Sequence, residues 1–586
     1  MSLIATSVPG SQAPFLAVEV GSTIVAIAIG FAWPTLGCKW FPRLEAALAR
    51  FARKKGLAVL VVGITAVLLR LLILPSSPIP HPFIHDDFSF LLAADTFSHG
   101  RLTNPTPVMW THFESFHIDM KPTYMSMYFP AQGLVLAVGK VVLGNPWFGL
   151  LIATALMCAA ICWMLQAWLP PSWAFLGGLM AVVHLGLFSY WVDTYAGAGS
   201  LAALGGALVL GGLPRFLRWI RIRHALLMSL GVVLLANTRP FEGLLLCLVV
   251  AGYLCHYFLR GKNPPSLSRV VLHSAPALAL LAAMCVGMGY YNYRVFGSPF
   301  TLPYTINRAT YGVAPYFIWQ SPRPAPVFRN EQMRDLYVGE ELDYYEKVHS
   351  KLYVPILLYR SFAVTRFFTG LSLLPVLLLL KRVSRDRRIR FLFVFVYVAV
   401  AALATQVFLV PHYFAPFTAA LYAVGLQCAR HMRQWKPGGN PTGMTLVRFM
   451  VAACLFVVCL RPFVSFMHFG LGDRGSVAWQ WLGTENFGKP RADIESALEG
   501  LPGQQLAIVR YSASHKPDDE WVYNCADINA SKVIWARELD PASNQKLIDF
   551  YRNRKVWLIQ PDLQQAPVSP YPAQEISQES FTKVVK

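Results

Sequence analysis

Three ionisable residues stand side by side in the stretch FIHDDFSFLLAADTFSHG, namely His85, Asp86 and Asp87. Two adjacent carboxylates repel each other and are costly to desolvate beside a membrane, so the pKa of one of them tends to rise. A carboxylate with a raised pKa can act as a general base. Neighbouring side chains on a helix point about 100° apart, so only one acid is expected to face a pocket. The alternative is that the acids cap the helix that follows.

The next segment, THFESFHIDMKPTYMSMYFPAQG (111–133), mixes cations, carboxylates and aromatic residues beside the bilayer. This mixture suits a ligand that has an anionic head and a lipid tail. Two His and one Glu also supply metal-ligand atoms, although their spacing matches no strong metal signature. The candidates are His85, Lys121, Tyr124 and Tyr128 for substrate binding, and His112, Glu114 and His117 for a divalent metal.

The composition of the whole chain is that of a membrane protein. Of the 586 residues, 55% are hydrophobic and 14% charged, whereas a soluble protein carries about a quarter charged residues. Apolar runs long enough to cross a bilayer recur, and we predict about twelve spanning helices. They are expected at 16–36, 57–74, 147–168, 172–191, 195–213, 224–237, 240–258, 270–291, 357–380, 391–409, 413–430 and 445–465.

The net charge of +20 is carried by short loops between the spans. The positive-inside rule places such loops in the cytoplasm. The basic clusters are separated by spans and lack interleaved aromatic residues, which argues against nucleic-acid binding. The chain start, the loops 75–146 and 292–352 and the chain after about 467 then face outward, and 128–144 is interpreted as an interfacial helix. The basic loops are 39–56, 215–223, 260–269, 381–390 and 430–439.

The last part of the chain has a different composition, with strand and helix patterns in turn. QLAIVRY, EWVYNC, KVIWARE and KVWLIQ read as strands, and ADIESALEG and NQKLIDFYRNR as helices, which predicts a small α/β domain outside the membrane. The expected fold is therefore a mostly α, multi-span membrane protein. Its parts are 1–56 (one helix and a basic loop), 57–466 (the catalytic membrane domain) and 467–586 (the α/β domain).

The first outer loop carries a family resemblance. An acidic pair that opens a long loop, followed by KPTYMSMYFPAQGLVLAVGKVVLGNPW (121–147), resembles the GT-C superfamily of membrane glycosyltransferases. The similarity is greatest to the protein O-mannosyltransferase and lipid A aminoarabinose transferase branch, although its double proline is reduced here to Pro130 and Ala131. The resemblance implies that Asp86 is the catalytic aspartate, Asp87 its acidic neighbour, and a polyprenyl-phosphate sugar the donor.

Other polar residues on the outer side are candidates for substrate binding. YWVDTYAGAGS places Asp193 between two spans, where a polar turn residue is the alternative. Arg239 and Glu242 lie near span ends, and intramembrane charges usually serve function, although an i, i+3 ion pair is the alternative. The remaining candidates are Arg294 or Arg308 in the second outer loop, to neutralise a phosphate, and His412 and Tyr413, for which helix capping with interfacial aromatics is the alternative.

These observations predict an inverting glycosyltransferase in a bacterial inner membrane, with both chain ends outside. Asp86 is expected to accept the proton of an acceptor hydroxyl or amine on a lipid, glycan or protein, while Lys121, Arg239 and Arg294 neutralise the leaving lipid phosphate. The chain has no Gly-rich nucleotide loop. The alternatives are a transporter or flippase, a polysaccharide ligase, and a receptor or scaffold that works through the last domain.

Overall fold

The computed structural model describes residues 13–261, 265–466, 487–563 and 566–572. Every predicted span falls on a helix within these residues. The predicted domain boundary at 467 and both chain ends lie outside them. The helices of the apolar part are α1 (Ala13–Ala32), α2 (Phe41–Ala52), α3 (Lys55–Leu72), α7 (Pro146–Trp168), α8 (Pro171–Leu185), α10 (Gly199–Trp219), α11 (Ile222–Ala236), α12 (Pro240–Arg260), α13 (Leu267–Phe296), α17 (Tyr353–Thr369), α18 (Leu380–Val383), α19 (Arg390–Leu403), α20 (Thr418–Arg433) and α21 (Thr442–Phe466).

Six of the described helices are long and apolar enough to cross a membrane, or seven if a bent pair counts as one span. Of the other predicted spans, 357–380 corresponds to the bent pair, 413–430 falls largely on α20, and the rest lie on shorter apolar helices, so the total of about twelve stays a prediction. Large apolar side chains such as Leu248 on α12 and Leu272 on α13 are exposed, with 60% and 70% of their surface accessible. Such outward-facing surface suits contact with hydrocarbon.

One predicted span is broken. The range 357–380 forms α17 and then the 3-10 helix η2 (Leu371–Leu379), which meet at an angle of 104°. Gly370 between them has φ 65°, a left-handed conformation that favours glycine. Glu19 of α1 accepts a hydrogen bond from Leu371 N at 3.0 Å, so the freed backbone group is satisfied by another helix. The predicted span 357–380 therefore corresponds to a bent pair of helices, which counts as one span if the chain crosses the membrane here.

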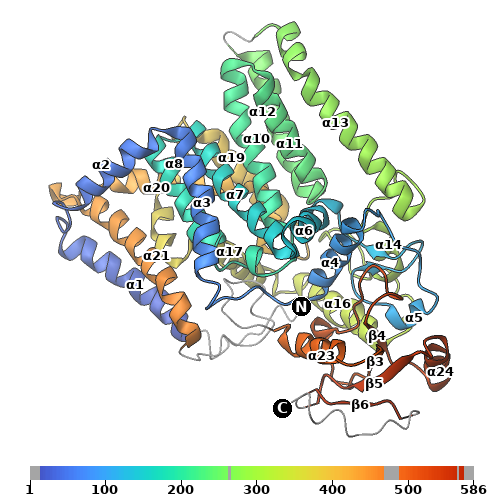
Figure 1. Ribbon diagram of the computed structural model, residues 1–586. Coiled ribbons are helices and arrows are strands. Elements are labelled where there is room, and N and C mark those ends of the chain that lie inside the picture. Colours follow the sequence, from blue (N-terminus) through green and yellow to red (C-terminus); the bar gives the residue numbers. More distant parts are fainter. Residues whose placement is uncertain (1–12, 262–264, 467–486, 564–565, 573–586) are drawn as a thin grey trace.

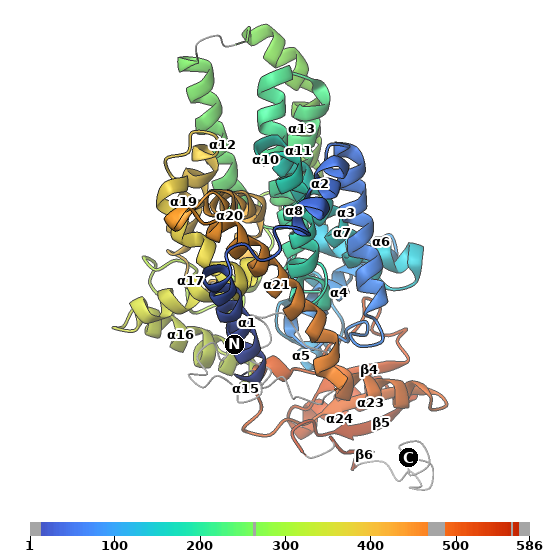
Figure 2. The ribbon, with the colours of Figure 1, turned by 90° about the vertical axis from the view of Figure 1, so that its left-hand side faces the viewer.

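Short elements connect the spans at the end of the molecule that carries the sheet (Figures 1 and 2). The first loop contains the hairpin of β1 and β2, which is antiparallel. The predicted interfacial range 128–144 forms α6, which packs between α4 and α7. The elements are α4 (His85–Ser98), α5 (Trp110–Phe113), β1 (Ile118–Asp119), β2 (Met125–Ser126), α6 (Pro130–Leu143), α9 (Tyr190–Asp193), α14 (Thr305–Tyr311), α15 (Glu331–Arg334), the π-helix η1 (Asp335–Glu340), α16 (Glu341–Val348) and the 3-10 helix η3 (Pro411–Phe417).

The last part of the chain forms a four-stranded sheet in the order β4-β3-β5-β6. Strand β3 is parallel to β4 and β5, and β6 is antiparallel to β5. In both ribbon views the sheet lies at one end of the molecule, and the ends of α12 and α13 that lead into a basic loop lie at the other. The elements are α23 (Lys489–Glu499), β3 (Gln504–Val509), η5 (Pro517–Asp519), β4 (Val533–Arg537), α24 (Pro541–Phe550), β5 (Arg554–Ile559) and β6 (Val568–Pro570).

One of the predicted strands, EWVYNC, is not a strand. The side chain of Asn524 pairs with the edge of β4: its amide donates to Trp535 O at 2.8 Å and its carbonyl accepts from Trp535 N at 2.9 Å. The side chain of Asn524 thus satisfies backbone groups at the edge of β4 that another strand would otherwise pair with. The segment therefore does not pair as a strand and extends toward the first outer loop.

Candidate active site

Asp87 anchors the start of α4. Its side chain is fully buried, with Oδ2 accepting from Phe83 N at 3.3 Å and Oδ1 from Tyr195 N at 2.8 Å. Burial raises the pKa of Asp87 to about 7 despite these hydrogen bonds. The N-cap residue of α4 is Ile84 and no side chain caps this helix, so the helix-capping interpretation is not confirmed. Asp87 instead fixes the start of α4 to the segment that precedes it and to the segment that follows α9.

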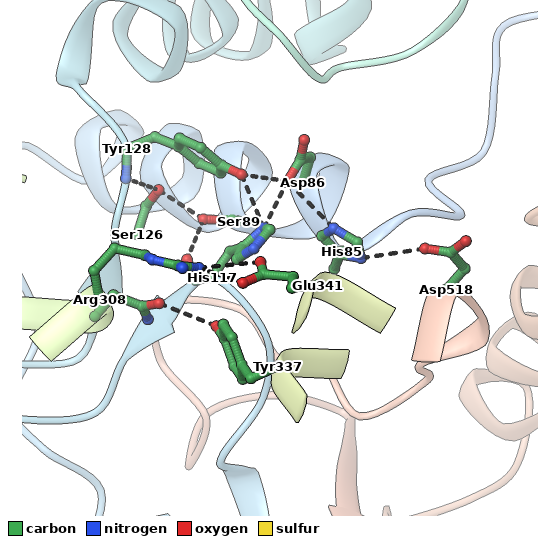
Figure 3. A network of polar contacts seen from close by, with 11 residues as sticks. His85, Asp86, Ser89, His117, Ser126, Tyr128, Arg308, Tyr337, Glu341 and Asp518 are labelled. Atoms are coloured by element: carbon green, nitrogen blue, oxygen red, sulfur yellow. Dashed lines mark hydrogen bonds and ion pairs between the residues drawn. The ribbon is translucent and has the colours of Figure 1, made fainter. Parts of the chain in front are cut away.

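Asp86 points the other way, into a polar cluster (Figure 3). Its Oδ1 accepts from His117 Nδ1 at 2.6 Å and from the Tyr128 hydroxyl, while His85 Nε2 lies 3.6 Å away. Among the described residues, Oδ2 makes no hydrogen bond, and the side chain is 23% exposed. Burial acts to raise the pKa of Asp86, but the hydrogen bonds and the charge of His117 outweigh burial and hold it well below its usual range. The raised pKa expected of the base is found at Asp87 instead.

The β1–β2 hairpin brings His117 and Tyr128 to the start of α4. His117 precedes β1 with φ 57°, and its carbonyl accepts from the Ser89 hydroxyl at 2.6 Å. Ser89 also lies 2.8 Å from the Ser126 hydroxyl of β2. The Tyr128 ring stacks on Phe90 with centroids 4.4 Å apart. Two residues of α4 therefore fix the hairpin that holds the partners of Asp86.

A cation from the membrane part stands near this cluster. Arg239, just before α12, donates to Gly197 O at 2.9 Å and lies over the ring of Tyr413 at 4.8 Å. Tyr304 packs edge-on against Tyr128, with centroids 5.3 Å apart. Burial raises the pKa of both Tyr304 and Tyr128, and the charge of Arg239 opposes both shifts. Arg239 is therefore within electrostatic range of the residues around Asp86.

Three other candidates from the spans have protein partners. Asp193 forms an ion pair with the fully buried Arg70 at 2.7 Å. His412 Nδ1 lies 3.0 Å from the hydroxyl of Tyr190. Glu242 is buried three residues after Arg239 in the sequence and interacts electrostatically with it.

Lys121, Arg294 and Tyr124 lie in other surroundings. Lys121 is exposed and lies over the Trp110 ring at 4.4 Å. Arg294 is exposed and donates to the Tyr290 hydroxyl at 3.0 Å. Tyr124 is buried, and its hydroxyl donates to the carbonyl of Asn524 in the last part of the chain at 3.0 Å. Within the described residues, the hydrogen bonds and ring contacts of these three side chains do not involve Asp86 or its hydrogen-bond partners.

The structure does not bring the three metal candidates together. His112 Nδ1 lies 2.9 Å from the carbonyl of Arg537, and Glu114 accepts from Arg329 at 2.9 Å. Instead, within the part of the chain that the structure describes, His85, Asp86 and His117 form the group that could hold a metal ion, with ligand atoms within 4.8 Å of one another. His112 faces the sheet because α5 packs against β4.

Residues from distant segments complete the surroundings. Arg308 of α14 forms a bidentate pair with Glu341, at 2.7 and 3.0 Å, so a protein carboxylate already neutralises it. Tyr304 begins α14, and Asp518 of η5 places Oδ1 3.9 Å from His85 Nδ1. In the sequence, only the aromatic and charged residues of the second outer loop pointed to Arg308, Glu341 and Tyr304. Nothing in the sequence pointed to Asp518.

Comparisons with known proteins give structural matches only. No family model matches the chain, and no curated protein matches it. Among solved structures, the chain is similar to ArnT from Cupriavidus metallidurans in the apo state, with 13% identity, a TM-score of 0.48, and coverage of 85% of this chain and 93% of ArnT. The chain is also similar to ArnT from Cupriavidus metallidurans bound to undecaprenyl phosphate, with 12% identity, a TM-score of 0.43, and coverage of 86% of this chain and 93% of ArnT.

The Archaeoglobus fulgidus oligosaccharyltransferase in complex with Zn and sulfate is also similar, with 10% identity, a TM-score of 0.45, and coverage of 86% of this chain and 67% of that chain.

Proposed function

We propose that the chain is a membrane glycosyltransferase that moves a sugar from a polyprenyl-phosphate donor to an acceptor hydroxyl or amine. The observation that carries the proposal is Asp86. It is partly exposed, its Oδ1 is held by His117 and Tyr128, and its Oδ2 makes no hydrogen bond among the described residues. One carboxylate oxygen is thus fixed by the protein while the other is open to a substrate.

In the proposed reaction the acceptor oxygen or nitrogen bonds to the anomeric carbon as the bond to the phosphate oxygen breaks. The acceptor proton goes to Asp86, and the lipid phosphate leaves with the electron pair. This proton becomes acidic only as the new bond forms, so a carboxylate that stays ionised can take it. A single displacement of this kind inverts the anomeric centre. Hexosyl and pentosyl donors both fit this scheme.

Arg239 is the proposed partner of the donor phosphate. It stands among Tyr304, Tyr413 and Tyr128, and it is partly exposed. A guanidinium can bind phosphate oxygens in a bidentate manner, and stabilising the developing charge speeds its departure. The apolar faces of these tyrosines suit the first isoprenoid or sugar units. Lys121 and Arg294, which lie elsewhere, become weaker candidates for this role.

A divalent metal is proposed as a cofactor. His85, Asp86 and His117 fit one chemically, since two imidazoles and a carboxylate are ligands that zinc accepts and their ligand atoms lie within 4.8 Å of one another. Ligand binding requires deprotonated groups, so the N–H that joins His117 to Asp86 would be given up. When bound, such an ion supplies positive charge for the donor phosphate.

The proposed setting is a bacterial inner membrane with the site on the outer face, where the acceptor is a lipid, a glycan or a protein. Two features support this sidedness. The site and the sheet share one end of the molecule, and the ends of α12 and α13 that lead into a basic loop lie at the other (Figure 2). Membrane lipids surround the apolar helices.

The test is to incubate the purified protein with a panel of labelled polyprenyl-phosphate sugars and with lipid, glycan and protein acceptors, and to measure donor consumption, with Asp86→Asn as the matched variant. The wild type is expected to consume at least one donor and the variant none. If no donor is consumed by the wild type, the proposal is wrong. A flippase would instead move labelled donor across vesicles without consuming it, so the same panel in sealed vesicles separates the two functions.

A further inference from the structure

A short stretch of the second outer loop, 316–318, is fixed to the loop that precedes η3. Val407 N donates to Tyr316 O at 2.8 Å, and the next residue, Phe317, forms an antiparallel bridge with Gln406. The ring of Phe317 also packs edge-on against Phe241 of α12, with centroids 5.0 Å apart. The backbone of Tyr316 is therefore held in place by two other segments of the chain.

The side chain of Tyr316 lies among the charges around Asp86. Arg308, which is paired with Glu341, lies over its ring at 5.0 Å from the centroid (Figure 3). The charged side chains that act most strongly on the Tyr316 hydroxyl are, in decreasing order, Arg308, Glu341, Arg239 and Asp86. Tyr316 is thus within electrostatic range of both the proposed phosphate partner and the proposed base.

The ring of Tyr316 is accessible although protein surrounds it. The residue is 39% exposed, yet desolvation by its surroundings raises the pKa of its hydroxyl. A side chain with both properties lines a concave space rather than the outer surface of the molecule. Among the described residues the Tyr316 hydroxyl makes no hydrogen bond, so one donor and its acceptor lone pairs are presented to this space.

The other three tyrosines near the site make different contacts. The hydroxyl of Tyr128 donates to the site carboxylate, and the ring of Tyr413 lies under the guanidinium that the donor phosphate would meet. Tyr304 packs edge-on against Tyr128. Tyr316 is the exposed residue of the four, so it is the one best placed to touch a further part of the substrate.

We infer that Tyr316 binds the sugar of the donor, with its hydroxyl bonded to a sugar hydroxyl, and so helps to set which sugar is accepted. The inference rests on the proposed function, in which the phosphate meets Arg239 and the acceptor proton meets Asp86. The anomeric carbon then lies between these two groups, and the sugar ring lies next to it. A tyrosine suits a sugar ring, because it combines a flat apolar face with a polar hydroxyl.

The contact is expected to discriminate between sugars. A site that is built to bond a substrate hydroxyl rejects an analogue that lacks this hydroxyl, because the polar group of the protein is then left unpaired. The fixed backbone of Tyr316 supports this role, since a preorganised group does not have to be ordered when the sugar binds.

The experiment measures equilibrium binding of labelled polyprenyl-phosphate glucose, mannose and xylose to the purified full-length protein, without acceptor. Polyprenyl phosphate that carries no sugar is measured alongside. The wild type is expected to bind at least one sugar lipid more tightly than the sugarless lipid. Tyr316→Phe, which removes only the hydroxyl, is expected to weaken binding of that sugar lipid about 3- to 10-fold, the usual effect of losing one neutral hydrogen bond, and to leave the sugarless lipid unaffected.

Tyr293→Phe is the matched control, because Tyr293 of α13 is also exposed and its hydroxyl also makes no hydrogen bond among the described residues. This variant is expected to bind both lipids like the wild type. Deoxy forms of the preferred sugar lipid test the same contact from the other side. One of them should bind the wild type and Tyr316→Phe equally, and melting temperatures show whether the variants keep the fold.

Three results would overturn the inference. In the first, Tyr316→Phe binds the preferred sugar lipid as tightly as the wild type. In the second, it weakens binding of the sugarless lipid to the same extent. In the third, the wild type does not distinguish any of the three sugar lipids from the sugarless lipid. Binding needs no transfer, so donor consumption can fail while the binding result stands, and the reverse.

Discussion

Two carboxylates, Asp86 in the first outer loop and Glu19 in α1, differ in how their oxygens are used. Glu19 is 1% exposed; Oε2 accepts from Arg366 at 3.0 Å and Oε1 from Leu371 N at 3.0 Å. Both oxygens are thus occupied by the protein. Asp86 is partly exposed and commits only Oδ1 to the hydrogen bonds made among the described residues. A buried charge with every lone pair satisfied stabilises a fold, whereas one with an oxygen left open can meet a substrate.

The largest effect is expected from changing Asp86, the carboxylate that has one oxygen open to a substrate. Asp86→Asn removes the proton acceptor but keeps the size of the side chain, so sugar transfer should fall by about 10²- to 10⁴-fold. The variant should fold but melt below the wild type, because the folded state lowers the pKa of Asp86 and so gains stability from its ionised form. Initial rates with the consumed donor, together with a thermal melt, check this. A variant that keeps more than a tenth of the rate would remove Asp86 from the reaction.

Glu19→Leu tests the carboxylate whose two oxygens both accept hydrogen bonds from the protein, and the expected loss is in stability. The change removes the acceptor for Arg366 and for Leu371 N at the helix break, which should cost about 3–5 kcal/mol. The measurement is unfolding in detergent by denaturant. The double variant with Arg366→Leu is the control, since replacing both partners of a buried pair is often close to neutral. Equal stability of Glu19→Leu and wild type would mean that the pair does not hold α1 to η2.

Asp119 sharpens the comparison, because it lies in the outer loop like Asp86 but is buried like Glu19. Burial raises its pKa to about 7, above the value of about 3.9 of an unfolded chain. The folded state therefore holds a proton that the unfolded state releases. The stability from this group is complete below about pH 4 and is lost as the pH rises through 7.

Asp119→Asn keeps the hydrogen bond from Asn307 and removes this titration. The melting temperature of the wild type should therefore fall, relative to the variant, between pH 4 and 7. The difference between the two melting curves isolates Asp119 from other groups such as His85. Parallel curves over this range would show that Asp119 does not carry a raised pKa.

The smallest effects are expected at two exposed cations. Lys121→Ala and Arg294→Ala should change stability by less than about 0.5 kcal/mol and leave the transfer rate near that of the wild type. Arg239→Ala is the matched variant near the site, and its rate should fall. The sugar-transfer rates of these three variants, measured at saturating donor, check this prediction. A large loss for either exposed residue, with Arg239→Ala unaffected, would move the phosphate site away from Arg239.

Much of the local structure could be predicted from patterns within a few residues. The apolar runs fall on helices, three of the four predicted strands form in the sheet, and the acidic pair begins a helix. The predicted strand EWVYNC does not form, because the side chain of Asn524 bonds the backbone at the edge of β4. The bend within the predicted span 357–380 could not be foreseen, because Glu19, far away in the sequence, accepts a hydrogen bond from Leu371 N at the break after Gly370.

The sequence by itself determined the membrane class of the chain and the choice of a candidate helix start, because composition and hydrophobic period are local properties. Only the tertiary structure decided which acid of the pair is buried and which faces the cluster, and which histidines join the cluster. The hydrogen bond to Asp86 comes from His117, 31 residues away in the sequence, and Asp518 beside His85 comes from a turn more than 400 residues away. Burial and hydrogen-bond partners from such distances set the charge state of a carboxylate, and no spacing within one segment encodes them.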